Sequence, residues 1–275
     1  MSKSFGLALG GGGARGLAHI AIFEAFDELR IKPAVIAGSS SGSLFGAAYA
    51  AGMSARTIRR FALTLTYDRA EVFRRLIASR ASTFASLLNL GFGSAALLDA
   101  EKLCNAFLPE QVPEAFDQLP IPLTVIATDL HRREQVEFSQ GALRPALAAS
   151  IALPTVMRPV AIDNRVLVDG AASNPLPFDL LRERADVIVA VDLSGEPALE
   201  RHDIPNPWEC VMATVLVMGG AITAEKIRQR APDLMVRPKV GLFRAFDFLQ
   251  ASAIVRAARP AKAELKQKLT ALLEN

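Results

Sequence analysis

Three short motifs in this chain carry the groups that acyl-transfer chemistry requires. A glycine run occupies residues 10–16, the motif GSSSG occupies residues 38–42, and the triplet Asp-Gly-Ala occupies residues 169–171. An acyl-transfer site needs a nucleophile, a base and donors for a developing oxyanion. A serine, an aspartate and the backbone N–H groups of glycines can supply these three parts. The motifs therefore predict an acyl-transfer site.

Ser40 is the candidate nucleophile. It is the central residue of a G-x-S-x-G motif between a predicted strand over 34–37 and a predicted helix over 42–51, which is the context that this motif needs. Such a turn exposes the central hydroxyl, and Gly38 and Gly42 relieve crowding around it. Serine- and glycine-rich turns are also common without chemistry, so the motif alone leaves both interpretations open.

The histidine that usually assists such a serine has no good candidate here. The chain contains only His19, His131 and His202. His19 falls within the first predicted helix and is expected to be a packed residue, and His202 falls in a polar stretch that is typical of a solvated loop. An α/β-hydrolase would place its histidine late, after the acid. A serine that works without histidine is the better hypothesis, and the dispersed histidines predict no metal site.

The glycine run also fits the G-x-G-x-x-G pattern of dinucleotide-binding folds. Such a fold places an acidic residue at the end of its second strand, where this chain has Gly38, Ser39 and Ser40. The Walker pattern fails too, because no Lys-Ser or Lys-Thr follows the glycines. The run instead offers a row of backbone N–H groups at a helix N-terminus, which suits an oxyanion. Arg15 either orients this loop, meets a substrate phosphate or forms an ion pair.

The elements that would position these motifs alternate between strand and helix. A strand over 5–9, a helix over 16–29, the strand over 34–37 and the helix over 42–51 predict a parallel sheet with helices on both faces. Further strands are predicted over 123–128, 136–138, 160–162, 166–168, 187–191 and 234–236, and helices over 211–230 and much of 249–273. We expect a three-layer α/β/α fold with a mainly parallel central sheet. It forms one domain over 1–275, with the motifs in a core over about 5–192 and a helical part over about 207–275.

Composition limits the function classes. The chain has 275 residues, 51% of them hydrophobic, and a net charge of +3. Its scattered Lys and Arg argue against nucleic-acid binding, which needs a concentrated basic stripe. No apolar signal region is predicted at the N-terminus, and the apolar stretch over 211–222 is expected to be too short to span a bilayer. Two unrelated cysteines are typical of reduced thiols. We expect a soluble, cytoplasmic protein whose membrane contact, if any, is peripheral, at the inner membrane surface.

Residues 73–92 alternate apolar side chains with three arginines. A basic amphipathic segment of this kind suits an anionic bilayer, but a lid or surface helix packed on the core has the same pattern, and the second interpretation is favoured.

With these motifs in place, the chain resembles the patatin-like phospholipases, in particular bacterial members similar to the catalytic domain of neuropathy target esterase. The resemblance covers about residues 5–192. It rests on GGGARGLAH at 11–19, GSSSG at 38–42, ASIALP at 149–154 with RPV at 158–160, and DGAASNP at 169–175. The chain departs from the family in having serine at both variable elbow positions and Ala171 where a second glycine is frequent. Neither departure removes a functional group.

The resemblance implies a patatin-like fold and a Ser–Asp dyad, with Ser40 as the nucleophile and Asp169 as its base. It places the oxyanion hole at backbone N–H groups of Gly11, Gly12, Gly13 and Ala14. Supporting or substrate-binding roles fall to Arg15, Gly16, Gly38, Gly42 and Gly170. A carboxylate with a pKa near 3.9 is a weak base toward a hydroxyl, so the oxyanion site must absorb much of the developing charge.

The predicted function is therefore a serine lipid acyl hydrolase that cleaves carboxylic esters of phospholipids or lysophospholipids through an acyl-serine. It requires no metal and no organic cofactor. A thioesterase or acyltransferase on the same dyad remains an alternative, as does a weakly catalytic lipid-binding regulatory protein.

Overall fold

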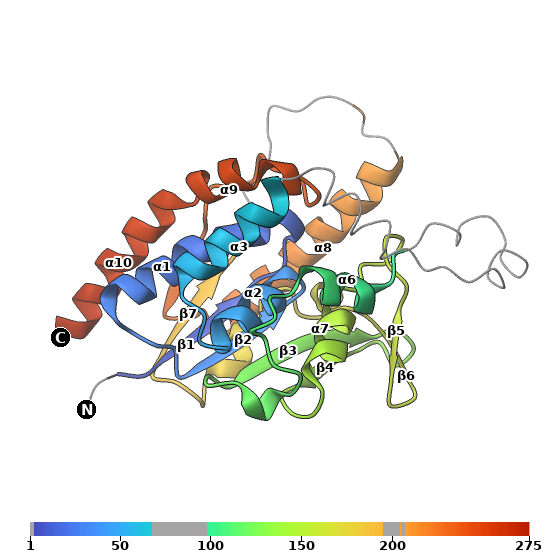
Figure 1. The fold of residues 1–275 in the computed structure, drawn as a ribbon, viewed down its shortest axis with the longest axis horizontal. Helices are drawn as coiled ribbons and strands as arrows, with labels where there is room; N and C mark the ends of the chain where they lie inside the picture. Colours follow the sequence, from blue (N-terminus) through green and yellow to red (C-terminus); the bar gives the residue numbers. More distant parts are fainter. Residues whose placement is uncertain (1–2, 68–97, 195–203, 205–206, 275) are drawn as a thin grey trace, which may run out of the picture.

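A computed structural model describes residues 3–67, 98–194, 204 and 207–274 (Figure 1). The predicted amphipathic segment 73–92 and His202 lie outside these residues. A single eight-stranded sheet runs through the described chain in the order β5-β6-β3-β2-β1-β7-β8, with β4 paired to β3. The strands are β1 (Phe5–Leu9), β2 (Val35–Ser39), β3 (Leu123–Asp129), β4 (Glu134–Phe138), β5 (Val160–Ile162), β6 (Arg165–Asp169), β7 (Val187–Val191) and β8 (Leu234–Val236).

Helices pack on both faces of this sheet. The longer ones are α1 (His19–Leu29), α2 (Ser41–Ala50), α3 (Ala55–Tyr67), α6 (Ala100–Phe107), α7 (Leu143–Ile151), α8 (Pro207–Gln229), α9 (Ala251–Ala257) and α10 (Arg259–Glu274). Short 3-10 turns are η1 (Gly13–Ala18), η2 (Phe116–Gln118), η3 (Gly170–Ala172), η4 (Phe178–Leu181) and η5 (Phe248–Gln250). In Figure 1, α10 lies alongside α1 above the sheet, so the C-terminal helix covers the first one.

Alternation along the strands produces two apolar layers of unequal size. Leu7 and Leu9 of β1 face a large core that α1, α2, α7, α9 and α10 complete. Ala8 of the same strand faces a smaller core, which η4 and Ile227 of α8 cover. Because successive side chains of a strand point to opposite faces, one buried strand serves both layers.

The register along β3 decides where the site forms. Residues Leu123 to Ile126 pair in parallel with β2, and residues Ala127 to Asp129 pair antiparallel with β6. β4 pairs along residues 125–129, so it occupies the other edge of β3. β2 and β6 therefore share one edge of β3 and meet there end to end: Ser39 pairs with Ile126, and Asp169 pairs with Ala127.

The predicted three-layer α/β/α fold with a mainly parallel sheet is confirmed. The antiparallel pairings are those of β4, β5 and β6. Asp163 and Asn164, which join β5 to β6, both have positive φ, as a two-residue hairpin turn requires. The single domain stays a prediction.

The apolar stretch over 211–222 needs a correction. It belongs to α8, and the segment Cys210–Gln229 within that helix is long and apolar enough to cross a membrane by length and composition, with only 11% of its most apolar window buried. The sequence-based length was too short because the helix continues past Ile222 through Thr223 and Ala224 before the next charged residue after Glu209, which is Glu225.

Candidate active site

Ser40 lies on a strained turn between β2 and α2. Its φ of +52° and ψ of −129° fall in a region that costs a non-glycine residue roughly 1–3 kcal/mol. The turn is held from inside by Ser43, whose N–H and Oγ both donate to the Ser40 carbonyl oxygen, at 2.9 and 2.6 Å. In this turn conformation the Ser40 side chain is half-buried, directly after the end of β2.

Asp169 is brought to Ser40 by the end-to-end meeting of β2 and β6. Ser40 Oγ donates to Asp169 Oδ2 at 2.7 Å, and the N–H of Ala171 donates to Oδ1 at 2.8 Å. The carboxylate is almost completely buried. Burial raises the pKa of Asp169 to about 6, although both hydrogen bonds act in the opposite direction. A carboxylate with this pKa is a stronger base than an ordinary aspartate and is still ionised at neutral pH.

The end of α7 holds both members of this pair. Ser150 Oγ accepts the N–H of Ser40 at 3.0 Å, and the carbonyl oxygen of Ala152 accepts the N–H of Asp169 at 3.0 Å. Ser150 is fully buried, so its hydroxyl has a fixed environment. Sequence reasoning gave Ser150 no role, and its presence in the block over 149–154 was the signal that could have found it.

A second support lies behind Asp169. Thr128 Oγ1 donates to the Asp169 carbonyl oxygen at 2.9 Å and lies 2.8 Å from Ser173 Oγ. Neither residue was among the predicted site residues, because their contribution depends on the pairing of β3 with β6.

The glycine run provides fewer donors than expected. Gly11 N–H donates to the carbonyl oxygen of Pro175 at 3.0 Å, and Ala14 N–H donates to that of Ala245 at 2.7 Å. These bonds correct the prediction that Gly11 and Ala14 are oxyanion donors. Within the described chain, the N–H groups of Gly12 and Gly13 have no acceptor and are the two donors left for a ligand.

Gly11 fixes how close the run comes to the serine. A Cβ on Gly11 would lie 3.0 Å from Ser40 Cβ and 3.5 Å from Ala171 Cβ, so the run packs directly over Ser40 and the turn that follows Asp169. A carbonyl carbon attacked by Ser40 would therefore have Asp169 on one side and the glycine run on the other.

Arg15 points inward rather than toward a ligand. It is almost fully buried, Nη1 donates to the carbonyl oxygen of Ser194 at 3.0 Å, and Nε donates to that of Gly12 at 3.4 Å. Burial lowers its pKa, and the charge of Asp192 opposes that shift. Of the three roles predicted for Arg15, these contacts favour orientation of the glycine loop.

The remaining glycines that the motifs singled out permit close backbone packing. A Cβ on Gly42 would lie 2.2 Å from the Leu9 carbonyl oxygen, and one on Gly170 would lie 2.2 Å from that of Ile126. A Cβ on Gly38 would lie 2.7 Å from the Gly42 carbonyl oxygen, and one on Gly16 would lie 2.7 Å from the side-chain Oγ of Ser41. These four glycines therefore shape the site and contribute no side-chain chemistry.

His19 supports the loop and takes no part in proton transfer. It is fully buried, its Nε2 lies 2.9 Å from the Gly10 carbonyl oxygen, and its ring stacks on Phe23. Burial lowers the pKa of His19 to about 4, so the ring is neutral at physiological pH. The prediction of a packed helix residue is confirmed. Among the described residues, no group of three His, Cys, Asp or Glu side chains is placed to hold a metal ion.

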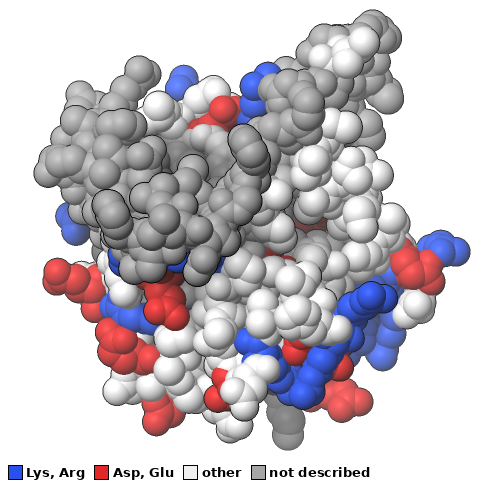
Figure 2. Space-filling view, turned by 90° about the vertical axis from the view of Figure 1, so that its right-hand side faces the viewer, with Lys and Arg blue, Asp and Glu red and all other residues white. Residues whose placement is uncertain are grey.

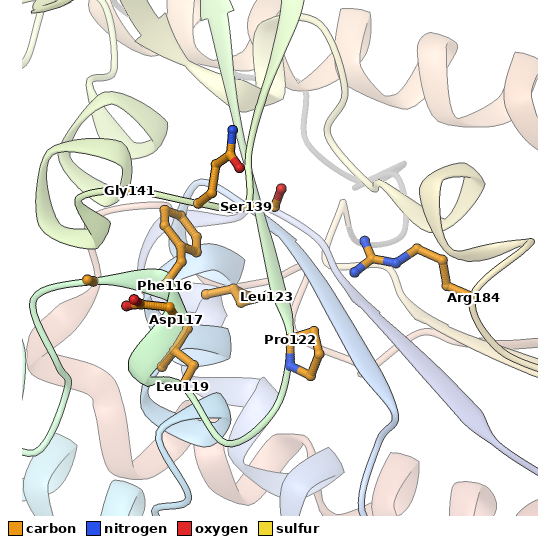
Figure 3. A pocket seen from close by; sticks show the side chains of 10 residues that line it. Phe116, Asp117, Leu119, Pro122, Leu123, Ser139, Gly141 and Arg184 are labelled. Carbon is orange, nitrogen blue, oxygen red and sulfur yellow. The ribbon is translucent and has the colours of Figure 1, made fainter.

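A cavity of about 510 Å³ lies elsewhere, at the N-terminal end of β3 (Figure 3). Phe116 and Leu119 line one side and Arg184 another, and the Arg184 guanidinium donates to Thr124 Oγ1 at 2.9 Å. The cavity shares no residue with the three motifs, so we assign it no part in the chemistry.

Strain at Ser40 predicts a stability difference between two variants at this position. Ser40→Gly removes the Cβ that makes φ of +52° costly, whereas Ser40→Ala keeps it. After allowance for the greater chain entropy of unfolded glycine, we expect Ser40→Gly to be more stable than Ser40→Ala by about 1 kcal/mol. Urea denaturation of both variants measures the difference. A more stable alanine variant would show that the turn is not strained.

Ser150 is expected to act as a positioning residue. Ser150→Ala removes the acceptor of the Ser40 N–H and should reduce kcat by about 10- to 100-fold with little change in KM, because the Ser40 hydroxyl is displaced by a fraction of an ångström. If Ser150 served only the stability of the fold, Ser150→Ala would lower the melting temperature but would not lower kcat at unchanged KM. The exposed residue Ser54, whose hydroxyl hydrogen-bonds to Thr57, gives the control variant Ser54→Ala, which should retain full activity.

Comparisons with known proteins agree with this geometry. The family model described as patatin-like phospholipase matches residues 7–182. A protein of Mycobacterium tuberculosis described as an uncharacterized NTE family protein is 38% identical over 207 residues, which are 74% of this chain and 53% of that protein. A lysophospholipase, NTE1, of Coccidioides immitis is 27% identical over 269 residues, covering 90% of this chain and 16% of that protein. This chain thus spans about half the length of the mycobacterial relative, and less of the other.

The fold also occurs among solved structures. The crystal structure of VipD from Legionella pneumophila matches with a TM-score of 0.51 at 14% identity, over 97% of this chain and 67% of that one. At this level of identity the match concerns the fold.

Proposed function

Because the chain belongs to the patatin-like phospholipase family, we propose that it is a serine lipid acyl hydrolase that cleaves carboxylic esters of phospholipids or lysophospholipids. The observation that carries the proposal is the 2.7 Å hydrogen bond from Ser40 Oγ to the buried carboxylate of Asp169. The name of the Coccidioides immitis relative supports lysophospholipids among the substrates.

The first half of the reaction makes an acyl-serine. Ser40 Oγ attacks the ester carbonyl carbon while Asp169 Oδ2 takes its proton, and the oxygen of the tetrahedral intermediate receives hydrogen bonds from the N–H groups of Gly12 and Gly13. When the intermediate collapses, the carbon–oxygen bond to the leaving alcohol breaks. Asp169 returns the proton to that alcohol, so the carboxylate is ionised again.

The second half regenerates the enzyme. A water molecule attacks the acyl carbon and loses a proton to Asp169, and a second oxyanion forms at Gly12 and Gly13. Its collapse breaks the bond to Ser40 Oγ, which recovers the proton from Asp169 as the fatty acid leaves. The scheme balances without a metal ion or an organic cofactor.

The raised pKa of Asp169 predicts the pH dependence of the reaction. The base must be ionised in the free enzyme, so kcat/KM should rise as the pH passes through about 6 and level off above about 7. The measurement uses a water-soluble p-nitrophenyl ester between pH 4.5 and 8.5, after a check that the enzyme stays folded throughout. Full activity down to pH 4.5 would contradict a base with this pKa.

A fluorophosphonate probe tests the nucleophile, because it attacks only an activated serine. Three adjacent hydroxyls, those of Ser39, Ser40 and Ser41, make the site of labelling informative. We expect one probe per chain on wild type and on Ser39→Ala and Ser41→Ala, and no labelling of Ser40→Ala, as read by mass spectrometry of the intact proteins and their peptides. No labelling of the folded wild type would favour a lipid-binding regulatory protein instead.

A further inference from the structure

We propose that an exposed apolar surface beside the active site docks this protein on an anionic lipid bilayer. The surface, called the apolar rim below, consists of residues 210–218 of α8 and residues 242–249, which precede and begin η5. The inference rests on the proposed function, since it gives the hydrolase access to its lipid substrate. It differs from the sequence-based expectation, which placed the basic amphipathic segment in 73–92.

The α8 part of the rim is unusually apolar for an exposed helix. Val217 is 71% exposed and Met218 is 60% exposed, with Val211 and Leu216 also exposed. No Asp, Glu, Lys or Arg occurs from residue 210 to 224. Contiguous exposed apolar side chains of this kind mark an interaction surface rather than ordinary surface composition.

The other half of α8 is fastened to the fold. Gly219 is buried, and a Cβ there would lie 3.6 Å from Pro175 in the loop that follows Asp169. Lys226 Nζ lies 2.8 Å from Asp179 Oδ1, and Ile227 packs on the smaller core. The helix is therefore tied to the loop that follows the proposed base.

Because α8 is anchored in this way, it can insert into one leaflet of a bilayer but cannot cross the whole bilayer. α8 begins at Pro207, so twelve of its residues precede the buried Gly219. At 1.5 Å per residue these twelve reach about 18 Å, well short of the roughly 30 Å hydrocarbon core of a bilayer. A full crossing by Cys210–Gln229 would also detach Lys226 from Asp179. The helix therefore suits insertion into one leaflet.

The second part of the rim lies against the glycine run. Leu242 is 92% exposed, and Phe246, Phe248 and Leu249 are exposed as well. The carbonyl oxygen of Ala245, within this stretch, accepts the N–H of Ala14. Apolar side chains thus occur both next to the proposed oxyanion donors and, through α8 and Pro175, next to the loop after Asp169. A bilayer contacting both would meet the site at its opening.

Charge favours an anionic bilayer over a second copy of this chain. Lys239 is exposed close in sequence to the apolar side chains of residues 242–249. The nearby carboxylate of Asp247 accepts the Arg244 N–H at 2.8 Å and so turns toward its own loop. An exposed lysine next to an apolar face suits anionic lipid, whereas two copies in contact here would bring their Lys239 charges together. Figure 2 shows a broad surface without charged residues beside a hollow that has acidic atoms at its floor.

Vesicle flotation tests the proposal with the 275-residue chain. The vesicles contain phosphatidylcholine alone or with phosphatidylglycerol as an anionic component, and the variants are Val217→Glu, Met218→Glu and Leu242→Glu. Leu273→Glu is the matched control, because Leu273 is 48% exposed near the end of α10, at the opposite end of the molecule from the upper end of α8 (Figure 1).

We expect wild type and Leu273→Glu to float with the anionic vesicles, and each rim variant to lose about tenfold or more in partitioning. Hydrolysis of a water-soluble ester should be unchanged in all of them, since these side chains touch no reacting group. Equal flotation of rim variants and wild type would overturn the proposal. So would a wild-type dimer in size-exclusion chromatography that the rim variants convert to monomer.

The two proposals fail separately. Vesicle binding that depends on the rim, without fluorophosphonate labelling of Ser40, would overturn the hydrolase and keep the docking surface. Labelling and ester hydrolysis without binding to anionic vesicles would keep the hydrolase and overturn the docking surface.

Discussion

Asp169→Asn is expected to reduce ester hydrolysis by about 10³- to 10⁴-fold while the fold persists. Asparagine has nearly the shape of aspartate, so its side-chain oxygen can still accept the N–H of Ala171 and its amide can remain near Ser40 Oγ. It cannot take the proton of the serine. The measurement is steady-state hydrolysis of a p-nitrophenyl ester at equal protein concentrations, and it gives the ratio of the variant rate to the wild-type rate. A variant with more than about a tenth of wild-type activity would exclude Asp169 as the base.

The same substitution should stabilise the protein at neutral pH. The folded-state pKa of Asp169 is about 6, above the value of 3.8 for an ordinary aspartate, so it is the protonated form that favours folding. That contribution is complete below about pH 3.8 and is lost as the pH rises through about 6. The uncharged asparagine side chain would resemble the protonated form at every pH. We therefore expect the free energy of unfolding at pH 8 to increase by about 1–3 kcal/mol, and the gain to shrink toward pH 4.5.

Asp129 supplies the matched control at the end of β3. Its Oδ1 accepts the N–H groups of His131 and Arg132, both at 3.0 Å, and hydrogen bonding lowers its pKa. Ionised Asp129 therefore contributes stability that is present above its unfolded pKa and lost at lower pH. Asp129→Asn should destabilise the protein at pH 8, opposite in sign to Asp169→Asn, and should leave kcat within a few-fold of wild type.

Gly13→Ala is expected to lower kcat by about 10²- to 10³-fold. The Gly13 φ is +58°, and a Cβ there would lie 2.3 Å from the Ala245 carbonyl oxygen. Backbone must move to relieve that contact, and the N–H groups of Gly12 and Gly13 move with it. Loss of one oxyanion donor costs about 3–4 kcal/mol of transition-state stabilisation. The measurement is kcat against KM on a soluble ester, with the loss expected in kcat.

Gly141 separates backbone strain from this catalytic effect. Its φ is +77°, but a Cβ there would meet nothing within 4 Å. Gly141→Ala should therefore lower stability through strain alone, and its kcat should equal that of wild type. A Gly13→Ala enzyme as active as Gly141→Ala would remove the glycine run from the mechanism.

Local patterns could predict the parts of the site but not how they meet. Ser40 follows from a G-x-S-x-G motif in its strand-to-helix context, and the order of elements in the first fifty residues follows from hydrophobic spacing. The proximity of Ser40 and Asp169 depends on the pairing of β2 and β6 with one edge of β3, which is a long-range property. At the level of sequence, only the resemblance to a known family predicted that Ser40 and Asp169 act as a pair.

Backbone donors were harder to assign than side chains. Gly11 and Ala14 sit in the same run as Gly12 and Gly13, but their N–H groups bond to Pro175 and to Ala245, both of which are far away in the sequence. Nothing in the local pattern reveals such a partner. Ser150 was missed for a related reason, since its hydroxyl matters only because α7 ends beside the turn at Ser40.

The end-to-end meeting of two strands on β3 has a consequence for which changes in length the protein tolerates. Ser40 and Asp169 are 129 positions apart, yet the separation between them is set by the single step from Ile126 to Ala127. Insertions or deletions in the connections between β2 and β3, or between β4 and β5, change the number of positions between Ser40 and Asp169. They leave the two side chains in place. One residue added to β3 at that step would push the two apart by about 3.3 Å and turn the following side chains to the opposite face of the sheet. Loop grafting and chain shortening in this protein should therefore leave the length of β3 untouched.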